Sequence, residues 1–464
     1  MNLWHLALRN LLRNRRRSLA TLLAMVVGLT AILLFGGYRS DILYGMETGF
    51  VQYSGHLQVQ RRGYFLDGGD DPAAYGIAGY QRIIDAIARD PVLAPMLRVV
   101  TPTLQLGGIA GHMESGHTRS VLASGLVARE WNRLLQWNDY GMVSYAQPLA
   151  LEDTAPDAAV VGTGVARKLQ LCALLRVAGC ENAAIPPAAQ AAAAEVPGNV
   201  AALSALERPP AAGLSAARIE MLVATARGAP NVASLQAVKA VNLGVKAIDD
   251  VYLAMHLPQA QRLLYGAQPP EVTSIVVQLH HTRQLAAARA RLQALLGQDF
   301  AAQGLEVLDF RTLNPAFGQT DEFMASMFGF IALLIAVIVL FTIANTMGTA
   351  VVERTVEIGT LRAMGQRCSG IRRLFLCEAL LLGAAGTALG LLGTAVVAWA
   401  INHSGWTWTP PGYSYAYMVL VRVWQDLPLL AGSVAGLLMV TVASAWWPAR
   451  RAARMGIVDA LRHA

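Results

Sequence analysis

The sequence predicts an α-helical integral membrane protein with four transmembrane helices and a large α+β extracytoplasmic domain inserted between the first and second helix. Three observations predict this fold class: four long runs without charge, a long polar segment between the first two runs, and arginines gathered beside the runs. The mean hydropathy of +0.41 and the 14% of charged residues fit a membrane protein with a soluble part attached. The predicted spans are residues 18–38, 323–352, 379–401 and 427–447.

The first span illustrates the length criterion. Ser18–Tyr38 holds 21 residues without a charge and, as a helix, measures about 31 Å, which is enough to cross the hydrocarbon core. A cleaved signal peptide is the alternative, but its apolar part would be shorter and would end at a cleavage site of small residues. We therefore expect a retained span. The other three runs are apolar on every face, which a buried core helix of this length rarely is.

The net charge of +7 is concentrated beside the spans. Residues 1–17, 353–378 and 448–464 carry 14 arginines and 4 acidic residues, whereas residues 39–322 carry 22 basic and 25 acidic residues. Cytoplasmic segments of membrane proteins are enriched in arginine and lysine. We therefore place both termini in the cytoplasm of a bacterial cell, with a chain that crosses the inner membrane four times. The soluble part has no basic stripe, which excludes nucleic acid, and membrane lipids are the partner expected for these arginines.

This topology also assigns a side of the membrane to each segment outside the spans. They are a cytoplasmic N-terminal helix (1–17), an extracytoplasmic domain (39–322), a cytoplasmic helical segment (353–378), an outer loop (402–426) and a cytoplasmic tail (448–464).

The extracytoplasmic domain shows a β-α-β pattern at each end. These patterns predict one membrane-proximal α+β layer, built from residues of about 50–127 and 270–315, around an inserted part of about 128–269. Within the inserted part, we expect Val245–Met255 to form one strand. The alanine- and proline-rich residues 183–214 are expected to form a loop or a surface helix.

The outer loop is rich in aromatic residues. They are Trp406, Trp408, Tyr413, Tyr415, Tyr417 and Trp424. This density is typical of the membrane–water interface, and packing against the large domain explains it equally well.

The four cysteines divide between two compartments. Cys368 and Cys377 are expected in the reducing cytoplasm, whereas Cys172 and Cys180 are expected outside, where a disulfide persists. A bond between Cys172 and Cys180 would close a short loop, and two free thiols are the alternative.

Two spans contain pairs of glycines four residues apart. Gly386 and Gly390 lie in the third span, and Gly432 and Gly436 lie in the fourth. Such pairs allow close approach of helices. The approach can occur within this chain or between two copies, and the pattern does not distinguish these uses.

The sequence contains no catalytic constellation of a known type. His112, Glu114 and His117 are residue types that bind metals, but the glycines around them favour a solvated turn, and we expect no metal site. No charged residue lies inside a predicted span, which argues against an ion-coupled transporter.

The segment 353–378 contains the most informative motif. It begins Glu353-Arg354-Thr355-Val356-Glu357-Ile358-Gly359 and continues through Leu361-Arg362-Ala363 to Gly365. On a helix, Glu353 and Glu357 share one face. Gly359 and Gly365 allow a bend or a close backbone contact. A plain cytoplasmic loop with orienting charges is the alternative interpretation.

The order of these residues resembles the E-R-x-x-E-I-G-x-L-R-A-x-G signature of the FtsX-like permease family, which includes the MacB and LolC/LolE types. The C-terminus is similar to the closing motif of the family over Pro448–Arg454 and Asp459–Arg462, although Gly456-Ile457 departs from it. Leu6–Asn14 also resembles the family, whereas residues 168–240 match it poorly.

The resemblance implies the permease subunit of a MacB/FtsX-type ABC transporter. In that family a cytoplasmic ATPase dimer binds ATP and magnesium, and its closure moves a coupling helix, here 353–378, which moves the outer domain through the spans. This mechanotransmission serves efflux or the handling of lipoproteins and other lipophilic substrates. The resemblance assigns ATPase coupling to Glu353, Arg354, Glu357, Gly359, Arg362 and Gly365.

Further partners follow from the same resemblance. They are a second copy or paralogue of the permease and a periplasmic adaptor or carrier. The alternative function is that of an FtsX-like regulatory protein that activates a cell-wall enzyme, and the large outer domain favours transport over this role.

We expect the chain to be a non-catalytic subunit without a cofactor of its own. Its three lysines are Lys168, Lys239 and Lys246, and none follows a glycine, so a phosphate-binding loop of the Gly-Lys-Ser/Thr type is absent. The expected arrangement is therefore the split one, with the ATPase in a separate chain.

The topology predicts a labelling pattern in intact cells. Cysteines introduced near residues 200 and 410 should react with an impermeant maleimide, and cysteines near 360 and 460 should react only after lysis, because the membrane excludes the reagent. Protection of a cysteine near residue 200 in intact cells would contradict the four-span topology.

Overall fold

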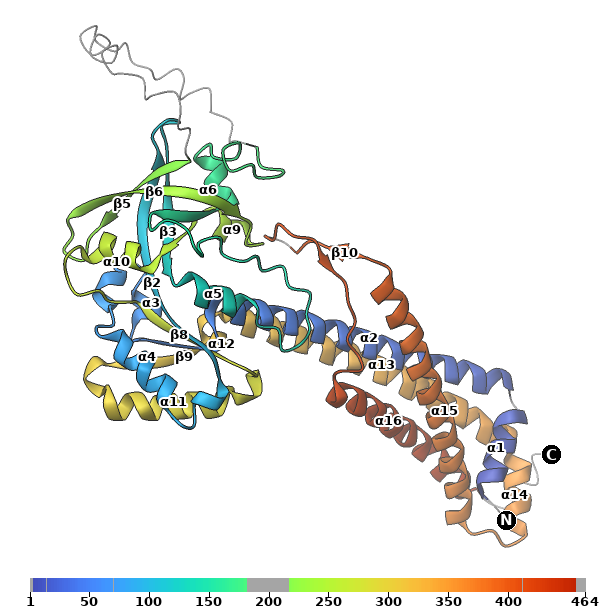
Figure 1. Ribbon diagram of the computed structural model, residues 1–464. Coiled ribbons are helices and arrows are strands. Elements are labelled where there is room, and N and C mark those ends of the chain that lie inside the picture. Colours follow the sequence, from blue (N-terminus) through green and yellow to red (C-terminus); the bar gives the residue numbers. More distant parts are fainter. Residues whose placement is uncertain (1–2, 14, 70, 182–216, 411, 456–464) are drawn as a thin grey trace. The chain divides into compact units, whose positions relative to one another are not determined.

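The computed structural model describes residues 3–13, 15–69, 71–181, 217–410 and 412–455. The expected loop at 183–214 and the tail beyond residue 455 lie outside the described residues. The chain forms two compact units (Figure 1). The helical unit comprises the described residues within 1–44, 316–408 and 417–464, and the sheet unit comprises those within 45–315 and 409–416.

Six helices account for most of the helical unit. They are α1 (Leu3–Arg13), α2 (Arg15–Ser54), α13 (Pro315–Glu353), α14 (Thr355–Ala363), α15 (Cys368–His403) and α16 (Leu427–Ala453). Among the described residues, four helical stretches are long and apolar enough to cross a membrane: Ser18–Ser54, Pro315–Glu353, Cys368–His403 and Leu427–Ala453. Each contains one of the four spans expected from the sequence. The short strands β10 (Thr407–Trp408) and β11 (Tyr417–Met418) pair between α15 and α16.

The first long helix continues well beyond its predicted span. With 40 residues, α2 is about 60 Å long, roughly twice the thickness of the hydrocarbon core. The helix passes Arg39 and Asp41 because both side chains have partners of opposite charge: Arg39 bonds with Asp321 at 2.5 Å, and Asp41 bonds with Arg422 at 2.8 Å. The first charge therefore marks the end of the apolar run but not the end of the helix.

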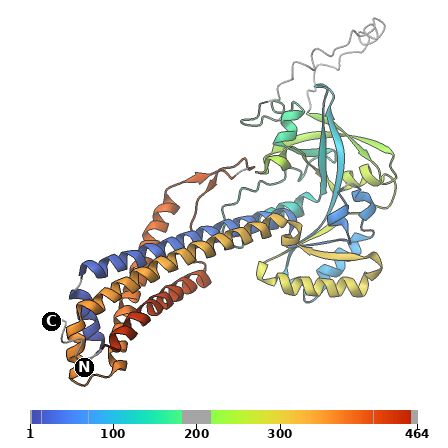
Figure 2. The ribbon, with the colours of Figure 1, turned by 180° about the vertical axis from the view of Figure 1, so that it is seen from behind.

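Helices α2 and α13 lie side by side in both views (Figures 1 and 2). The rings of Phe35 and Phe328 stack with centroids 6.2 Å apart, and the hydroxyls of Thr21 and Thr346 form a hydrogen bond of 2.9 Å. Thr21 precedes Phe35 in α2, whereas Thr346 follows Phe328 in α13. The two helices are therefore antiparallel.

The sheet unit contains nine strands and eight α-helices among its described residues. Its strands are β1 (Leu57–Arg61), β2 (Leu97–His112), β3 (His117–Leu126), β4 (Ala158–Gly162), β5 (Arg218–Ala224), β6 (Pro230–Val241), β7 (Tyr252–His256), β8 (Ser274–Leu279) and β9 (Leu305–Asp309). Its helices are α3 (Tyr64–Asp67), α4 (Tyr80–Arg89), α5 (Ala128–Leu135), α6 (Thr163–Lys168), α9 (Lys246–Asp249), α10 (Leu257–Tyr265), α11 (Leu285–Asp299) and α12 (Phe310–Leu313).

One nine-stranded sheet runs through the whole unit in the order β3-β7-β4-β6-β5-β2-β8-β1-β9. Strand β2 joins its two parts. Residues Leu97–Thr103 pair with β8, and residues Leu104–His112 pair with β3. Residues Ile109–Gly111 of β2 also pair with β5, so a strand from the range expected for the membrane-proximal layer is bonded to a strand from the range expected for the inserted part.

The core beside β8 and β9 is closed by α4 and α11. Ile83 and Ile87 of α4 are buried, as are Leu292 and Leu296 of α11. Two bonds from Arg291 to Asp90 tie the end of α4 to α11 and hold the pKa of the Asp90 carboxyl below its usual value. This ion pair fixes the two helices relative to each other.

His56 is a buried histidine within this core. Its Nδ1 accepts a hydrogen bond from the backbone of Leu279 at 3.1 Å, and its ring meets the ring of Trp137 edge-on at 4.9 Å. Burial lowers the pKa of His56 to about 3, so the ring is neutral at physiological pH. Its role is to satisfy a backbone N–H inside the core.

The single strand expected at Val245–Met255 is wrong. Residues Lys246–Asp249 form the short helix α9, and only Tyr252–His256 form a strand. The Asp249 carboxylate accepts a hydrogen bond of 2.7 Å from the backbone of Leu243, and burial raises its pKa to about 6. This bond closes the chain into a turn where the apolar pattern predicted an extended run.

Residues 409–416 of the outer loop belong to the sheet unit. The ring of Tyr415 stacks on Tyr145 with centroids 5.7 Å apart, and Ser414 donates a backbone hydrogen bond to Gly244. The backbone of Lys246 donates to Gly412. Of the two uses considered for the loop aromatics, packing against the large domain is therefore the one that Tyr415 has.

The glycine pairs of the third and fourth spans have different surroundings. A Cβ atom at Gly386 would lie 2.8 Å from Sδ of Met25, and one at Gly390 would lie 2.9 Å from Cδ2 of Leu29. Both neighbours belong to α2 of the same chain. At Gly432 and Gly436 a Cβ atom would meet no described atom within 4 Å. The first pair is a packing site within the chain, and the second pair leaves an open helix surface.

Cys172 and Cys180 are joined by a disulfide that closes a loop between residues eight positions apart. The loop-closure model assigns a bond across so short a segment about 2.5 kcal/mol of stability. We predict that Cys172→Ser with Cys180→Ser lowers the free energy of unfolding by this amount, measured by chemical denaturation of the detergent-purified protein. Cys377→Ser is the control, because this cysteine is not part of a disulfide. Full alkylation of Cys172 and Cys180 without reductant would contradict the bond.

The glycine surroundings yield a matched pair of variants. Gly390→Val should destabilise the helical unit by about 1–3 kcal/mol, because the added methyl groups collide with Leu29. Gly436→Val makes the same chemical change on an open surface and should leave the melting temperature of the chain unchanged. Equal melting temperatures of the two variants would contradict the assignment. A change in oligomeric state in Gly436→Val alone would assign the second pair to a contact between copies.

Candidate functional site

The segment singled out by its motif forms a short helix between two long ones. Helix α13 ends at Glu353, Arg354 interrupts the helix, and α14 covers only Thr355–Ala363. Gly365 then adopts a left-handed backbone with φ of +90°, which a glycine accommodates without strain, and α15 begins at Cys368. The coupling helix expected over 353–378 is therefore α14 followed by a tight turn and the first turns of α15.

Arg354 is buried between α13 and α14, where it also meets α1 and α15. Its Nη1 donates to Oε1 of Glu378 on α15 at 3.0 Å, and its Nη2 donates to the backbone oxygen of Asn10 on α1 at 3.1 Å. The Asn10 side chain donates to the same Glu378 oxygen at 2.5 Å. The side chains of Arg354 and Glu378 are only 6% and 3% exposed. These bonds form a closed triangle, which we call the Arg354 cluster.

Arg362 faces the bundle at the other end of α14. Its Nη1 donates to the backbone oxygen of Ala453 at 2.8 Å, at the last residue of α16, and also to Sγ of Cys368. The last carbonyls of a helix lack partners within the helix and carry partial negative charge, so a guanidinium there is favourable. Arg362 therefore connects α14 to the end of the fourth long helix.

Apolar packing adds to these bonds. Ile358 and Gly359 of α14 are buried. Ile358 belongs to a core cluster that includes Val351 of α13, Phe375 of α15 and Ala449 of α16. One face of α14 is thus part of the core of the helical unit.

The opposite face of α14 is exposed. Val356 and Thr360 of α14 and Met364, which caps the C-terminus of the helix, follow one another at intervals of four residues and line one edge, and Met364 is 71% exposed. Glu357 bonds with Arg13 of α1 at 2.6 Å, but both side chains are about half exposed, so this pair contributes little to stability. Glu353 is also exposed.

A second set of polar contacts lies at the other end of the helical unit. Besides the Arg39–Asp321 and Asp41–Arg422 pairs, Ser40 donates to Asp426 at 2.7 Å. These contacts cannot be predicted from local sequence, because each joins residues more than 280 positions apart. The only local signal is a charge placed directly after or before an apolar run.

The metal-binding residue types at the β2–β3 turn do not form a site. His112 is buried, and its Nδ1 lies 3.1 Å from the backbone oxygen of Leu169, whereas Glu114 is exposed. The expectation that all three residues lie in a solvated turn is therefore wrong for His112. Among the described residues, no group of three or more His, Cys, Asp or Glu side chains is placed to hold a metal ion.

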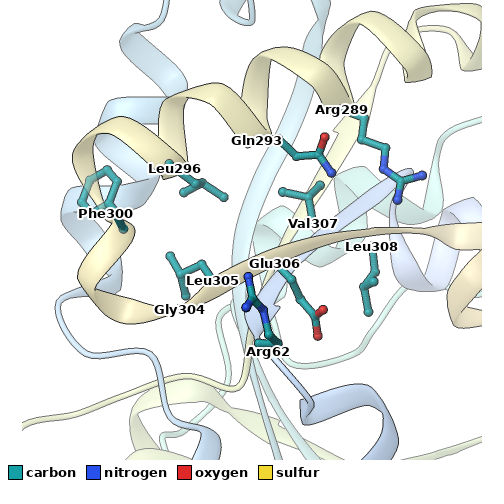
Figure 3. A pocket seen from close by; sticks show the side chains of 12 residues that line it. Arg62, Arg289, Gln293, Leu296, Phe300, Gly304, Leu305, Glu306, Val307 and Leu308 are labelled. Carbon is teal, nitrogen blue, oxygen red and sulfur yellow. The ribbon is translucent and has the colours of Figure 1, made fainter.

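A groove of about 480 Å³ lies in the sheet unit between α11 and β9 (Figure 3). Its labelled lining residues are Arg62, Arg289, Gln293, Leu296, Phe300, Gly304, Leu305, Glu306, Val307 and Leu308. Arg289 bonds with Asp309 at 2.9 Å, and Glu306 accepts a hydrogen bond from the backbone of Gly63. Because these two charged groups already hold the unit together, we assign the groove no ligand.

Comparison with known proteins places the candidate site inside a recognised domain. Residues 329–457 match the model of the FtsX-like permease C-terminal domain. This range contains α14, α15 and α16 and most of α13. The Arg354 cluster, apart from Asn10, therefore lies within the matched region.

Three curated relatives show the same relationship. The macrolide export ATP-binding/permease protein MacB of Bordetella avium is 30% identical over 188 residues, which cover 40% of this chain and 27% of the relative. The ABC transporter permease YtrF of Bacillus subtilis is 34% identical over 143 residues, with 29% of this chain and 30% of the relative covered. The pyoverdine export ATP-binding/permease protein PvdT of Pseudomonas syringae is 30% identical over 213 residues, with 46% of this chain and 30% of the relative covered.

The chain thus spans less than a third of the length of these relatives. The domain match, the names of the relatives and the four apolar helices nevertheless agree with the family expected from the E-R-x-x-E-I-G motif. Residues 329–457 are thus an FtsX-like permease C-terminal domain, and the chain is similar to MacB/FtsX-like ABC transporter permeases.

Proposed function

We propose that this chain is a non-catalytic permease subunit that pairs with a separate cytoplasmic ATPase and transmits its motion to the sheet unit by mechanotransmission. The observation that carries the proposal is α14, a helix with one face built into the helical unit and the other face exposed. A helix of this kind can bind a partner on its exposed face and pass a displacement to the helices behind it. ATP and magnesium would be bound by the partner.

The proposed orientation places α1, α14 and the C-terminus in the cytoplasm of a bacterial cell and the sheet unit outside the inner membrane. Arginines beside the apolar helices support this orientation. The disulfide between Cys172 and Cys180 supports it as well, because such bonds persist outside the cytoplasm.

The residues expected to act in ATPase coupling divide into two groups. Arg354, Gly359 and Arg362 lie on the inner side of α14, so we assign them to holding the helix. Glu353 and Glu357 are exposed, together with the edge formed by Val356, Thr360 and Met364 and the turn at Gly365. We propose that this exposed face enters a groove of the ATPase, a common mode of helix recognition.

The substrate is proposed to be handled by the sheet unit outside the membrane. The predicted spans contain no charged residues that would line a polar pathway. Two relatives are named for export of macrolides and of pyoverdine, which supports efflux or lipophilic-substrate handling as the class of activity. A second permease copy, membrane lipids and a periplasmic adaptor or carrier are the further proposed partners. Activation of a cell-wall enzyme is the alternative, and the size of the sheet unit favours transport.

The exposed face of α14 allows a direct test of ATPase binding. We predict that Met364→Glu reduces co-purification of the ATPase at least about tenfold, because burying an unpaired carboxylate costs more than the 1.4 kcal/mol that a factor of ten requires. The matched control is Met113→Glu, which introduces the same charge at a methionine of the sheet unit that is 82% exposed. The measurement is the amount of ATPase recovered with affinity-tagged permease from detergent-solubilised membranes. Equal recovery from the two variants would contradict docking on this face.

The charged residues of the motif extend the test. Glu357→Lys and Arg362→Glu should each abolish transport and lower ATPase recovery, the first through the exposed face and the second by releasing α14 from α16. If the charges only set membrane orientation, Arg362→Lys and Glu357→Ala would leave transport and ATPase recovery unchanged. Normal ATPase recovery and stimulation in both charge-reversed variants would reject the coupling role.

A further inference from the structure

The Arg354 cluster joins three segments that are far apart in the chain. Asn10 lies 344 positions from Arg354 and 368 positions from Glu378. Arg354 contributes one bond to α1 and one to α15, and Asn10 closes the triangle. The arginine itself is the residue between α13 and α14, so α13, α14, α1 and α15 all meet at this one side chain.

A buried ion pair of this kind does more for geometry than for stability. Removing two charges from water costs about as much as their attraction returns, so an apolar pair of the same volume is often equally stable. The guanidinium is a rigid planar fork whose bonds have fixed directions. Apolar side chains packed in the same place would allow α14 to slide or turn against its neighbours. The cluster therefore fixes the position of α14 relative to α1 and α15.

The link to α1 has a consequence for the first long helix. Helix α1 ends at Arg13 and α2 begins at Arg15, so a displacement of α1 acts directly on α2. Besides the cluster, α14 has another ionic bond to α1, the exposed Arg13–Glu357 pair, and Ile358 of α14 shares a core cluster with Met25 of α2. Such an exposed pair is weak and is screened by salt.

We propose that Arg354 and Glu378 are positioning residues that carry a displacement of α14 into α1 and α15 as well as into α13. The first and third long helices then move with the second when the ATPase displaces α14. This inference rests on the proposed function, because the ATPase supplies the displacement. It adds a route through the N-terminal helix, in which Asn10 is the contact residue.

The test is hydrogen–deuterium exchange on the purified permease–ATPase complex, measured with and without ATP and magnesium. Deuterium uptake is followed separately in three segments: α1, α14 and the first turns of α15. In the wild-type complex, nucleotide should change exchange in all three segments. In the double variant Arg354→Met with Glu378→Leu, the change should remain in α14 and be reduced in α1 and in the turn of α15 around Glu378, because Arg362 still bonds to Cys368 at the start of α15. Replacing both charges avoids leaving one of them buried without a partner, so this variant should fold.

Two further variants separate positioning from simple stability. The exchanged pair Arg354→Glu with Glu378→Arg should restore part of the response in α15, because an ion pair is again present. Arg13→Gln removes the exposed bond between α1 and α14 and should leave the response of all three segments unchanged. A variant that only lost stability would exchange faster in every state, with or without nucleotide.

The outcomes distinguish this inference from the proposed function. If the double variant keeps the nucleotide response of the wild type in α1 and α15, the route through the cluster does not exist, although ATPase coupling stands. If the wild-type chain recovers no ATPase at all, the proposed function fails first, in the co-purification experiment.

Discussion

Charged groups are costly in hydrocarbon, and this constraint places the polar contacts of the helical unit at the two ends of its apolar stretches. At one end Arg354 bonds with Glu378, and at the other end Asp41 bonds with Arg422. Between the ends, helices approach through small residues, as Gly390 does against α2. The polar contacts have fixed directions and set the register of the helices. The small residues set how closely the helices approach.

The same constraint separates the two faces of α14. Residues on its inner face bond to fixed partners, as Arg362 does to the end of α16, and Ile358 fills the core behind them. On its outer face, Val356 and Met364 expose apolar surface to solvent, which a short helix would not do without cost. A helix with this asymmetry is suited to receive a force on one side and to deliver it on the other.

Much of the fold could be predicted because hydropathy and local motifs are properties of neighbouring residues. Each of the four expected spans lies within one of the four apolar helices, and the E-R-x-x-E-I-G motif lies in the range 329–457 that matches the FtsX-like permease C-terminal domain. The bonds of Asn10 could not be predicted, because Asn10 lies 344 positions from Arg354 and 368 positions from Glu378. The glycine pairs of the third and fourth spans have the same spacing but different surroundings. Spacing alone does not show which face of a helix packs against a neighbour. The turn at Asp249 was missed because one carboxylate bond to Leu243 outweighed the apolar pattern of a strand.

The length of α13 has a consequence for the membrane around it. Its uncharged stretch, residues 323–352, measures about 45 Å along the helix, whereas the hydrocarbon core is about 30 Å thick. Large apolar side chains are exposed along this whole stretch, from Phe323 through Phe341 to Val352. Such hydrophobic mismatch is relieved by tilting the helix or by thickening the bilayer locally. Because Arg354 and α14 follow directly after α13, a tilt of α13 that relieves such a mismatch would also displace α14.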